Sequence, residues 1–250
     1  VKTLAQGISI EVAAMTGALA YCFSDTFWYS AVEGEVYAYS SLFTAVVFWL
    51  ILKWEDNADK PGADRWLILI AYLTGLSIGV HLLNLLCLPA LVLVWYYKRY
   101  RNPSVKGSIV ALLASFVLVA IVLYGIVPGI VKVGGWFELF FVNTLSLPFN
   151  SGLVVYIFIL IGVVLWAIWE STVQKSRKRM NISFIAGIGM LGIPFYGHGV
   201  KCIVIGIVVM ALMYFVLNKK KSDIHLISAR VMNTTLLCLL MIMIGYSSYA

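Results

Sequence analysis

Long apolar runs separated by short polar connectors dominate the chain. A helix needs about 20 residues to cross ~30 Å of hydrocarbon, and many of the runs without Asp, Glu, Lys or Arg approach or exceed this length. Several are short enough to be tilted, broken or re-entrant rather than full spans. The predicted apolar segments cover 8–24, 36–53, 66–80, 83–97, 108–131, 152–170, 182–197, 201–217 and 227–246.

The uncharged run 66–97 is divided between two of these segments. As one helix it would be about 48 Å long, which is too long for a single ordinary span. The sequence Gly79-Val80-His81 offers a place for the chain to break. We therefore predict two short helices, with a re-entrant hairpin over the same run as the alternative.

The basic residues predict how the segments are oriented. If the first segment enters from the inner side, all but two of the 18 Lys and Arg residues fall on that side, and the exceptions are Lys132 and Lys201. This bias follows the positive-inside rule, and it would be lost if 66–97 were a single span. Trp28 and Trp136 fall at outer ends and the other six tryptophans at or near inner ends, as expected for aromatic belts at both interfaces.

The composition agrees with this pattern, since 62% of the residues are hydrophobic and only 12% are charged. Soluble domains contain about 45–50% apolar and about 25% charged residues, so a soluble globule, a disordered chain and a disulfide scaffold are excluded. The predicted fold class is an all-α polytopic transmembrane helical bundle that forms a single domain over 1–250. Because the chain starts at Val1 and stops just after an apolar run, we expect a fragment of a longer protein.

Several function classes are disfavoured by what the chain contains. The net charge of +7 comes from topology signals rather than from a basic face, which argues against a nucleic-acid partner. No Walker A loop or HExxH motif occurs. The cysteines lie inside apolar runs without metal-ligand spacing, so we predict buried thiols rather than disulfides or metal ligands. They are Cys22, Cys87, Cys202 and Cys238.

The few polar residues of the apolar regions collect on the predicted outer side. Polar groups at membrane depth usually face a cavity or one another, so we expect a shared pocket on this side. The residues concerned are Asp25, Glu33, Glu35, His81, Asn84, Glu138, Asn143, Asn150 and His198.

An acidic pair is the first candidate site. Glu33 and Glu35 flank Gly34 where a helix is predicted to begin. Such a pair can bind a divalent cation, or one carboxylate can act as a base while the other orients it, so both are candidate catalytic residues and tentative metal ligands. The alternative is a solvated turn with acids at a helix N-terminus. Asp25 and Tyr37, in the same stretch, are candidate substrate-binding residues.

A histidine and an asparagine form the second candidate. His81 and Asn84 lie three residues apart, on one face if a helix begins there. This neutral pair suits sugar hydroxyls, a phosphate or a relay with the glutamates. The alternative is a hydrogen-bonded packing role.

The third candidate is the outer segment 132–151. Its residues 134–143 resemble a short interfacial helix, and 147–152 turns the chain into the next span. Glu138 and Asn150 are its candidate substrate-binding residues. A simple amphipathic connector is the alternative.

Four stretches carry a resemblance to a known family. They are 17–28, 31–37, 71–85 and 147–152. They resemble a bacterial polytopic membrane family long catalogued as a domain of unknown function, which is similar to protein O-mannosyltransferases and more widely to GT-C glycosyltransferases. The resemblance covers most of the chain.

The resemblance implies a GT-C-like fold and a sugar transferred from a polyprenyl-phosphate donor on the outer face. It implies that Glu33 and Glu35 form an acidic motif that supports a metal, the donor or the acceptor. The main catalytic carboxylate is then expected before Val1.

The sequence thus predicts an inverting membrane glycosyltransferase of the bacterial inner membrane, with its active face outward. Its expected partners are membrane lipid, the lipid-linked sugar and an acceptor protein or glycan, with a divalent cation as a possible cofactor. The alternatives are a transporter or lipid flippase and a non-catalytic membrane scaffold. A transporter favours inverted repeats and polar residues along a path through the membrane, and neither is visible.

Overall fold

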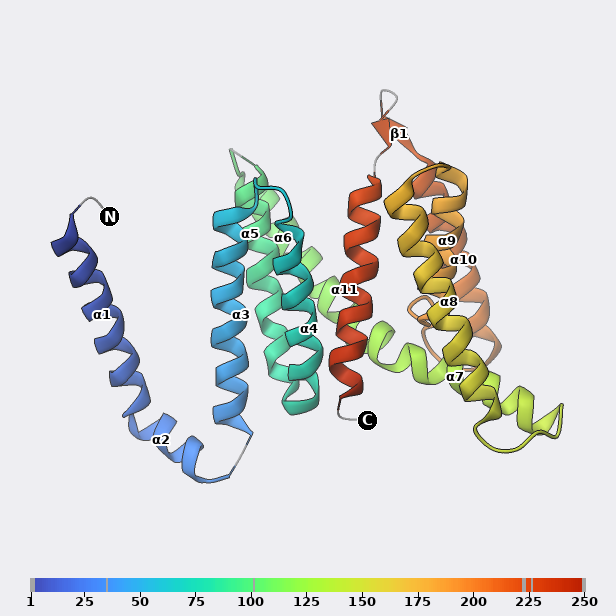
Figure 1. Ribbon diagram of the computed structural model, residues 1–250, viewed down its shortest axis with the longest axis horizontal. Helices are drawn as coiled ribbons and strands as arrows, with labels where there is room; N and C mark the ends of the chain where they lie inside the picture. The colour runs from blue at the N-terminus through green and yellow to red at the C-terminus, as the bar shows by residue number, and fades with distance from the viewer. Residues whose placement is uncertain (1–2, 35, 101, 222–223, 226, 249–250) are drawn as a thin grey trace.

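The computed structural model describes residues 3–34, 36–100, 102–221, 224–225 and 227–248. These residues form helices joined by short connections (Figure 1), with one short antiparallel hairpin near the C-terminal end. The elements are α1 Leu4–Cys22, α2 Asp25–Val32, α3 Tyr37–Asn57, α4 Asp64–Val80, the 3-10 helix η1 Leu82–Leu86, α5 Cys87–Arg99, α6 Val105–Ala120, the π-helix η2 Ile121–Ile126, α7 Val127–Asn143, α8 Ser151–Val173, α9 Arg177–Met190, α10 Gly199–Asn218, β1 Lys220–Lys221, β2 Ile224–His225 and α11 Ala229–Ser247.

The predicted all-α polytopic fold is confirmed. Within the described residues, six helices are long and apolar enough to cross a membrane, or seven if α1 and α2 form one bent span. Each predicted apolar segment coincides with a helix, although α4 and α9 are shorter than a usual span.

The predicted break near His81 is also confirmed. His81 has an extended backbone with φ −160° between α4 and η1, and it stops the helix. α5 packs against α3 and α6, and Figure 1 shows it leading back to the end of the bundle where α4 begins, so the chain turns back at this point. The polar connection 58–63 and the β1–β2 hairpin therefore share one end of the bundle, and the His81 turn lies at the other end.

The helix predicted within 132–151 is longer than expected. α6, η2 and α7 form one continuous helix over Val105–Asn143. A helix of this length measures about 58 Å, twice the hydrocarbon thickness, so it cannot cross the membrane upright. Figure 1 shows α7 running obliquely toward the far side of the molecule. Pro128 lacks an N–H and would clash with the carbonyl of Tyr124 in a regular α-helix, and the wider π turn before it accommodates this.

α11 returns from the end of the chain to pack against α4. A Cβ atom on Gly75 would overlap the main-chain carbonyl of Ile242, and one on Gly245 would overlap that of Tyr72, so the two backbones touch. At the end of the bundle opposite the His81 turn, Arg230 donates to both carboxylate oxygens of Asp64, from Nε at 2.6 Å and from Nη2 at 2.7 Å.

α11 also joins the two parts of the core. Its residues Ile242 and Met243 belong to a cluster with α4, η1 and η2, whereas Met232 and Leu236 pack with α8 and α9.

All four cysteines are free, as predicted. Cys22 is exposed on α1, contrary to the expectation of burial, because α1 has no buried residue and stands at the edge of the molecule (Figure 1).

Candidate functional site

Tyr37 and His81, predicted from separate stretches, lie together where α3 begins and α4 ends. Their ring centroids are 5.6 Å apart. The His81 Nδ1 atom accepts a hydrogen bond from the main-chain N–H of Leu83 at 3.2 Å and so caps η1. This bond fixes the ring, and Nε2 is the ring nitrogen left for another partner.

Asn84 lies on η1, which directly follows His81, and its side chain is buried, with an exposed fraction of 5%. Its Oδ1 accepts hydrogen bonds from Ser40 Oγ at 2.8 Å and from Thr44 Oγ1 at 2.9 Å. Its Nδ2 is buried and has no hydrogen-bond partner among the described residues. A buried donor without an acceptor costs about 1–3 kcal/mol, so an oxygen atom that reached this amide would be bound favourably.

Ser40 and Thr44 are site residues that the sequence analysis missed. They lie four residues apart and face the same side of α3. This hydroxyl pair within an otherwise apolar segment was the available signal. We call Tyr37, Ser40, Thr44, His81 and Asn84 the α3–α4 cluster.

The stretch that carries Asp25, Glu33 and Glu35, here called the acidic loop, lies next to the α3–α4 cluster in sequence. Asp25 is exposed in the first turn of α2, where a carboxylate is favoured by the helix dipole, and Ser24 caps the helix by accepting from Phe27 N–H at 3.4 Å. Glu33 is exposed directly after α2. Glu35 lies outside the described residues.

The described residues do not form a metal site. No group of three or more His, Cys, Asp or Glu side chains in this part of the chain could hold a metal ion. Glu33, as a single exposed carboxylate, is a poor ligand set for a divalent cation. We therefore derive no chemical step from a cation.

Glu138 and Asn150 are brought together elsewhere, at the junction of α7 and α8. Glu138 Oε1 accepts from Asn150 N–H at 2.6 Å, and Oε2 accepts from Leu153 N–H at 2.9 Å. The carboxylate thus caps the N-terminus of α8, whose first N–H groups have no partner within the helix. Both oxygens contact main chain, so the geometry favours an anchoring role over substrate contact.

The structure forms two separate groups rather than the single pocket expected. In Figure 1 the α2–α3 connection and the α7–α8 connection lie toward opposite sides of the molecule, at the same end of the bundle. The oblique α7 carries Glu138 away from the α3–α4 cluster.

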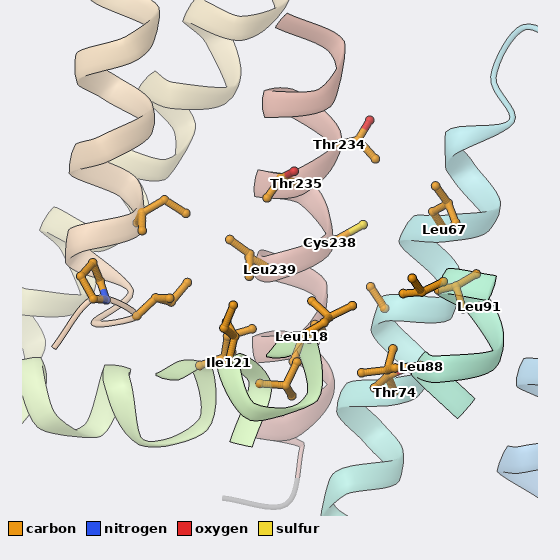
Figure 2. Close-up of a pocket in the computed structure, with 18 of the residues that line it drawn as sticks. Leu67, Thr74, Leu88, Leu91, Leu118, Ile121, Thr234, Thr235, Cys238 and Leu239 are labelled. Carbon is orange, nitrogen blue, oxygen red and sulfur yellow. The ribbon is translucent and has the colours of Figure 1, made fainter. Parts of the chain in front are cut away.

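A cavity of about 740 Å³ lies between the two halves of the bundle. Helices α4, α5, α6, η2, α9, α10 and α11 all contribute to its wall, and Figure 2 shows Leu88, Leu118 and Leu239 facing into it. Its volume falls within the range of about 300–1,000 Å³ that is usual for ligand pockets.

The cavity wall offers an occupant little except hydrocarbon. Two hydroxyl groups of the wall already donate to acceptors within the protein, Thr74 Oγ1 to Ile70 O at 2.8 Å and Thr234 Oγ1 to Asp64 Oδ2 at 3.0 Å. An acyl or isoprenoid chain suits such a wall. The sequence could not reveal the cavity, because apolar residues that face lipid and those that line a cavity look alike.

Neither a curated protein nor a solved structure shows significant similarity to the chain. A family model does match, over residues 1–104, and it is described as the Protein O-mannosyl-transferase TMEM260 N-terminal domain. The matched part runs from α1 to the end of α5 and contains the acidic loop and the α3–α4 cluster. The predicted similarity to protein O-mannosyltransferases is thus confirmed for residues 1–104, which is less than half of the chain rather than most of it, and the match supports a glycosyltransferase-like membrane protein.

Proposed function

We propose that the protein transfers a sugar from a polyprenyl-phosphate donor to a hydroxyl group of a protein or glycan acceptor. The observation that carries this proposal is the coincidence of the family match over 1–104 with the α3–α4 cluster. The cluster combines an aromatic ring, an imidazole and a buried amide without an acceptor. Aromatic and amide groups of this kind suit the faces and hydroxyls of a sugar.

The reaction needs little from the protein beyond positioning and one base. A carboxylate accepts the proton of the acceptor hydroxyl, whose oxygen then attacks the anomeric carbon of the sugar. The bond from that carbon to the phosphate oxygen breaks, and polyprenyl phosphate leaves with the electron pair. Attack from the side opposite the leaving group inverts the anomeric carbon. Glu33 and Glu35 would position the acceptor beside His81 and Asn84.

The apolar cavity supports a lipid-linked donor. Its wall matches an isoprenoid chain, which would be held between the helices while the phosphate and sugar remain at the membrane surface. A soluble nucleotide sugar would make no use of it.

The charge distribution supports work on the outer face of a bacterial inner membrane. The Asp64–Arg230 pair and the basic connections lie at the end of the bundle opposite His81. Under the positive-inside rule the basic end faces the cytoplasm, so the α3–α4 cluster faces outward.

The proposal is tested by replacing Glu33 and Glu35 with glutamine in the full-length protein. Transfer of labelled sugar from a polyprenyl-phosphate donor is measured in proteoliposomes. We expect transfer to be abolished while membrane insertion is unchanged. Asp56→Asn, an exposed acid at the opposite end of α3, is the matched control and should transfer normally.

Two results would contradict the proposal. Unchanged transfer by the double variant would remove Glu33 and Glu35 from the mechanism. Movement of the labelled lipid between leaflets by wild-type protein, without sugar transfer, would favour a flippase instead.

A further inference from the structure

Lys132 lies on α7, away from the basic connections of the chain, and its side chain projects onto the α9–α10 turn. Its Nζ donates to the carbonyl of Phe195 at 3.0 Å and to that of Gly197 at 2.7 Å. An ammonium group has three N–H donors, so one remains for another acceptor. No carboxylate of the described residues lies within ion-pair distance of Lys132. Its charge is therefore not neutralised by this part of the protein.

The turn that Lys132 holds also closes one end of the apolar cavity. Pro194 and Tyr196, on either side of Phe195, contribute to the cavity wall. The Tyr196 ring packs edge-on against Tyr124, and Phe195 packs against Trp136. Such aromatic side chains are typical of the membrane interface. Lys132 is not itself a wall residue, but its ammonium is held at the carbonyls of Phe195 and Gly197, next to the wall residues Pro194 and Tyr196.

The surroundings of the cavity explain why this charge would select the ligand. An apolar chain gains little by leaving lipid for an apolar cavity, because lipid tails are as apolar as the wall. The headgroup must therefore decide which lipid stays bound. A positive charge with a free donor favours an anionic oxygen, and phosphate is the common anion at this depth.

We propose that Lys132 binds the phosphate of a single-chain polyprenyl phosphate whose chain occupies the cavity. This inference rests on the proposed function, because it assigns the donor's phosphate to a residue outside the matched region 1–104. Lys132 has two tasks in this arrangement. It positions the α9–α10 turn through two carbonyls and presents its third N–H to the ligand.

The test measures binding of labelled polyprenyl phosphate and labelled polyprenol to the full-length protein in nanodiscs. Wild-type protein should bind the phosphate more tightly than the alcohol, and added salt should reduce the difference. Lys132→Met should weaken polyprenyl-phosphate binding about tenfold and leave polyprenol binding unchanged. Lys132→Arg should retain most of the preference.

Three controls accompany these variants. Lys201→Met removes the other basic residue of this end and should bind as wild type. Val209→Phe narrows the cavity and should weaken both ligands. Inorganic phosphate and phosphatidic acid should not displace the bound polyprenyl phosphate.

The outcomes separate this site from the proposed function. Equal binding of the two ligands by wild-type protein would overturn the inference, as would parallel loss of both in Lys132→Met, since Lys132 would then act only through the turn. Displacement by phosphatidic acid would overturn the preference for a single chain. If binding behaves as expected but no sugar is transferred, the proposed function fails and the lipid-phosphate site stands.

Discussion

Glu138 provides a direct test of whether a polar residue at the α7–α8 junction serves the fold or the substrate. Its carboxylate accepts from Asn150 N–H at 2.6 Å and from Leu153 N–H at 2.9 Å, and it meets the positive end of the α8 dipole. Gly152 is packed so closely on α7 that a Cβ atom would lie 2.5 Å from Phe137 O. The carboxylate and this contact together fix the angle between α7 and α8.

The expected cost of losing this carboxylate can be estimated from its contacts. Removing a helix N-cap costs about 0.5–2 kcal/mol, and a hydrogen bond to a charged group contributes about 1.5–3 kcal/mol when well shielded. Glu138 is partly exposed, so water replaces some of the lost bonding. We expect Glu138→Ala to lower the unfolding free energy by about 2 kcal/mol. Glu138→Gln keeps one acceptor oxygen and should cost about half as much.

The assay is thermal unfolding in detergent, followed by tryptophan fluorescence. For a chain of this size, about 2 kcal/mol corresponds to a fall in Tm of roughly 4–8 °C. Asn143→Ala, near the end of the same helix, is the matched control and should leave Tm unchanged. An unchanged Tm in Glu138→Ala, combined with loss of sugar transfer, would refute the anchoring role and restore Glu138 as a substrate ligand.

Three further predictions concern packing, charge and orientation. Gly75→Ala should lower the unfolding free energy by about 1–3 kcal/mol, because the added Cβ would overlap the Ile242 carbonyl. Gly162→Ala, where a Cβ meets open space, should be neutral or slightly stabilising, and thermal unfolding compares the two variants. Arg230→Met should cost about 0.2–1 kcal/mol in low salt and less in high salt, since its partner Asp64 is only partly buried; unfolding at two ionic strengths checks this. Phe149→Cys should be labelled in intact cells by a membrane-impermeant thiol reagent, and labelling only after lysis would reverse the proposed orientation.

The positions of the helices could be predicted because they depend on local properties. Run length and the placement of basic residues were enough to divide 66–97 at His81. The extent of α7 could not be predicted in the same way. Pro128 normally marks a helix start, and only the observed π turn at 121–126 allows the helix to continue through it.

The candidate site depends on contacts that are distant in sequence. Asn84 was identified as polar and outward, but its bonds to Ser40 and Thr44 join residues more than 35 positions away. Glu138 was singled out by its charge, which cannot distinguish a ligand for substrate from a cap for the next helix. Lys132 was noted only as an exception to the charge bias, and its place near the cavity follows from the contact of α7 with the α9–α10 turn.

The contact between α4 and α11 has a consequence for how the protein is made. Asp64 and its partner Arg230 are 166 positions apart, which at about 5–20 residues per second is roughly 10–30 s of synthesis. During that interval α4, which has only 17 residues, leaves the translocon without the helix that covers its glycine face. The nascent chain must therefore wait in a partly assembled state, open to membrane chaperones and proteases, until α11 inserts. A ribosome that stalls before the codon for Ala229 would release a product whose α4 has lost its main partner.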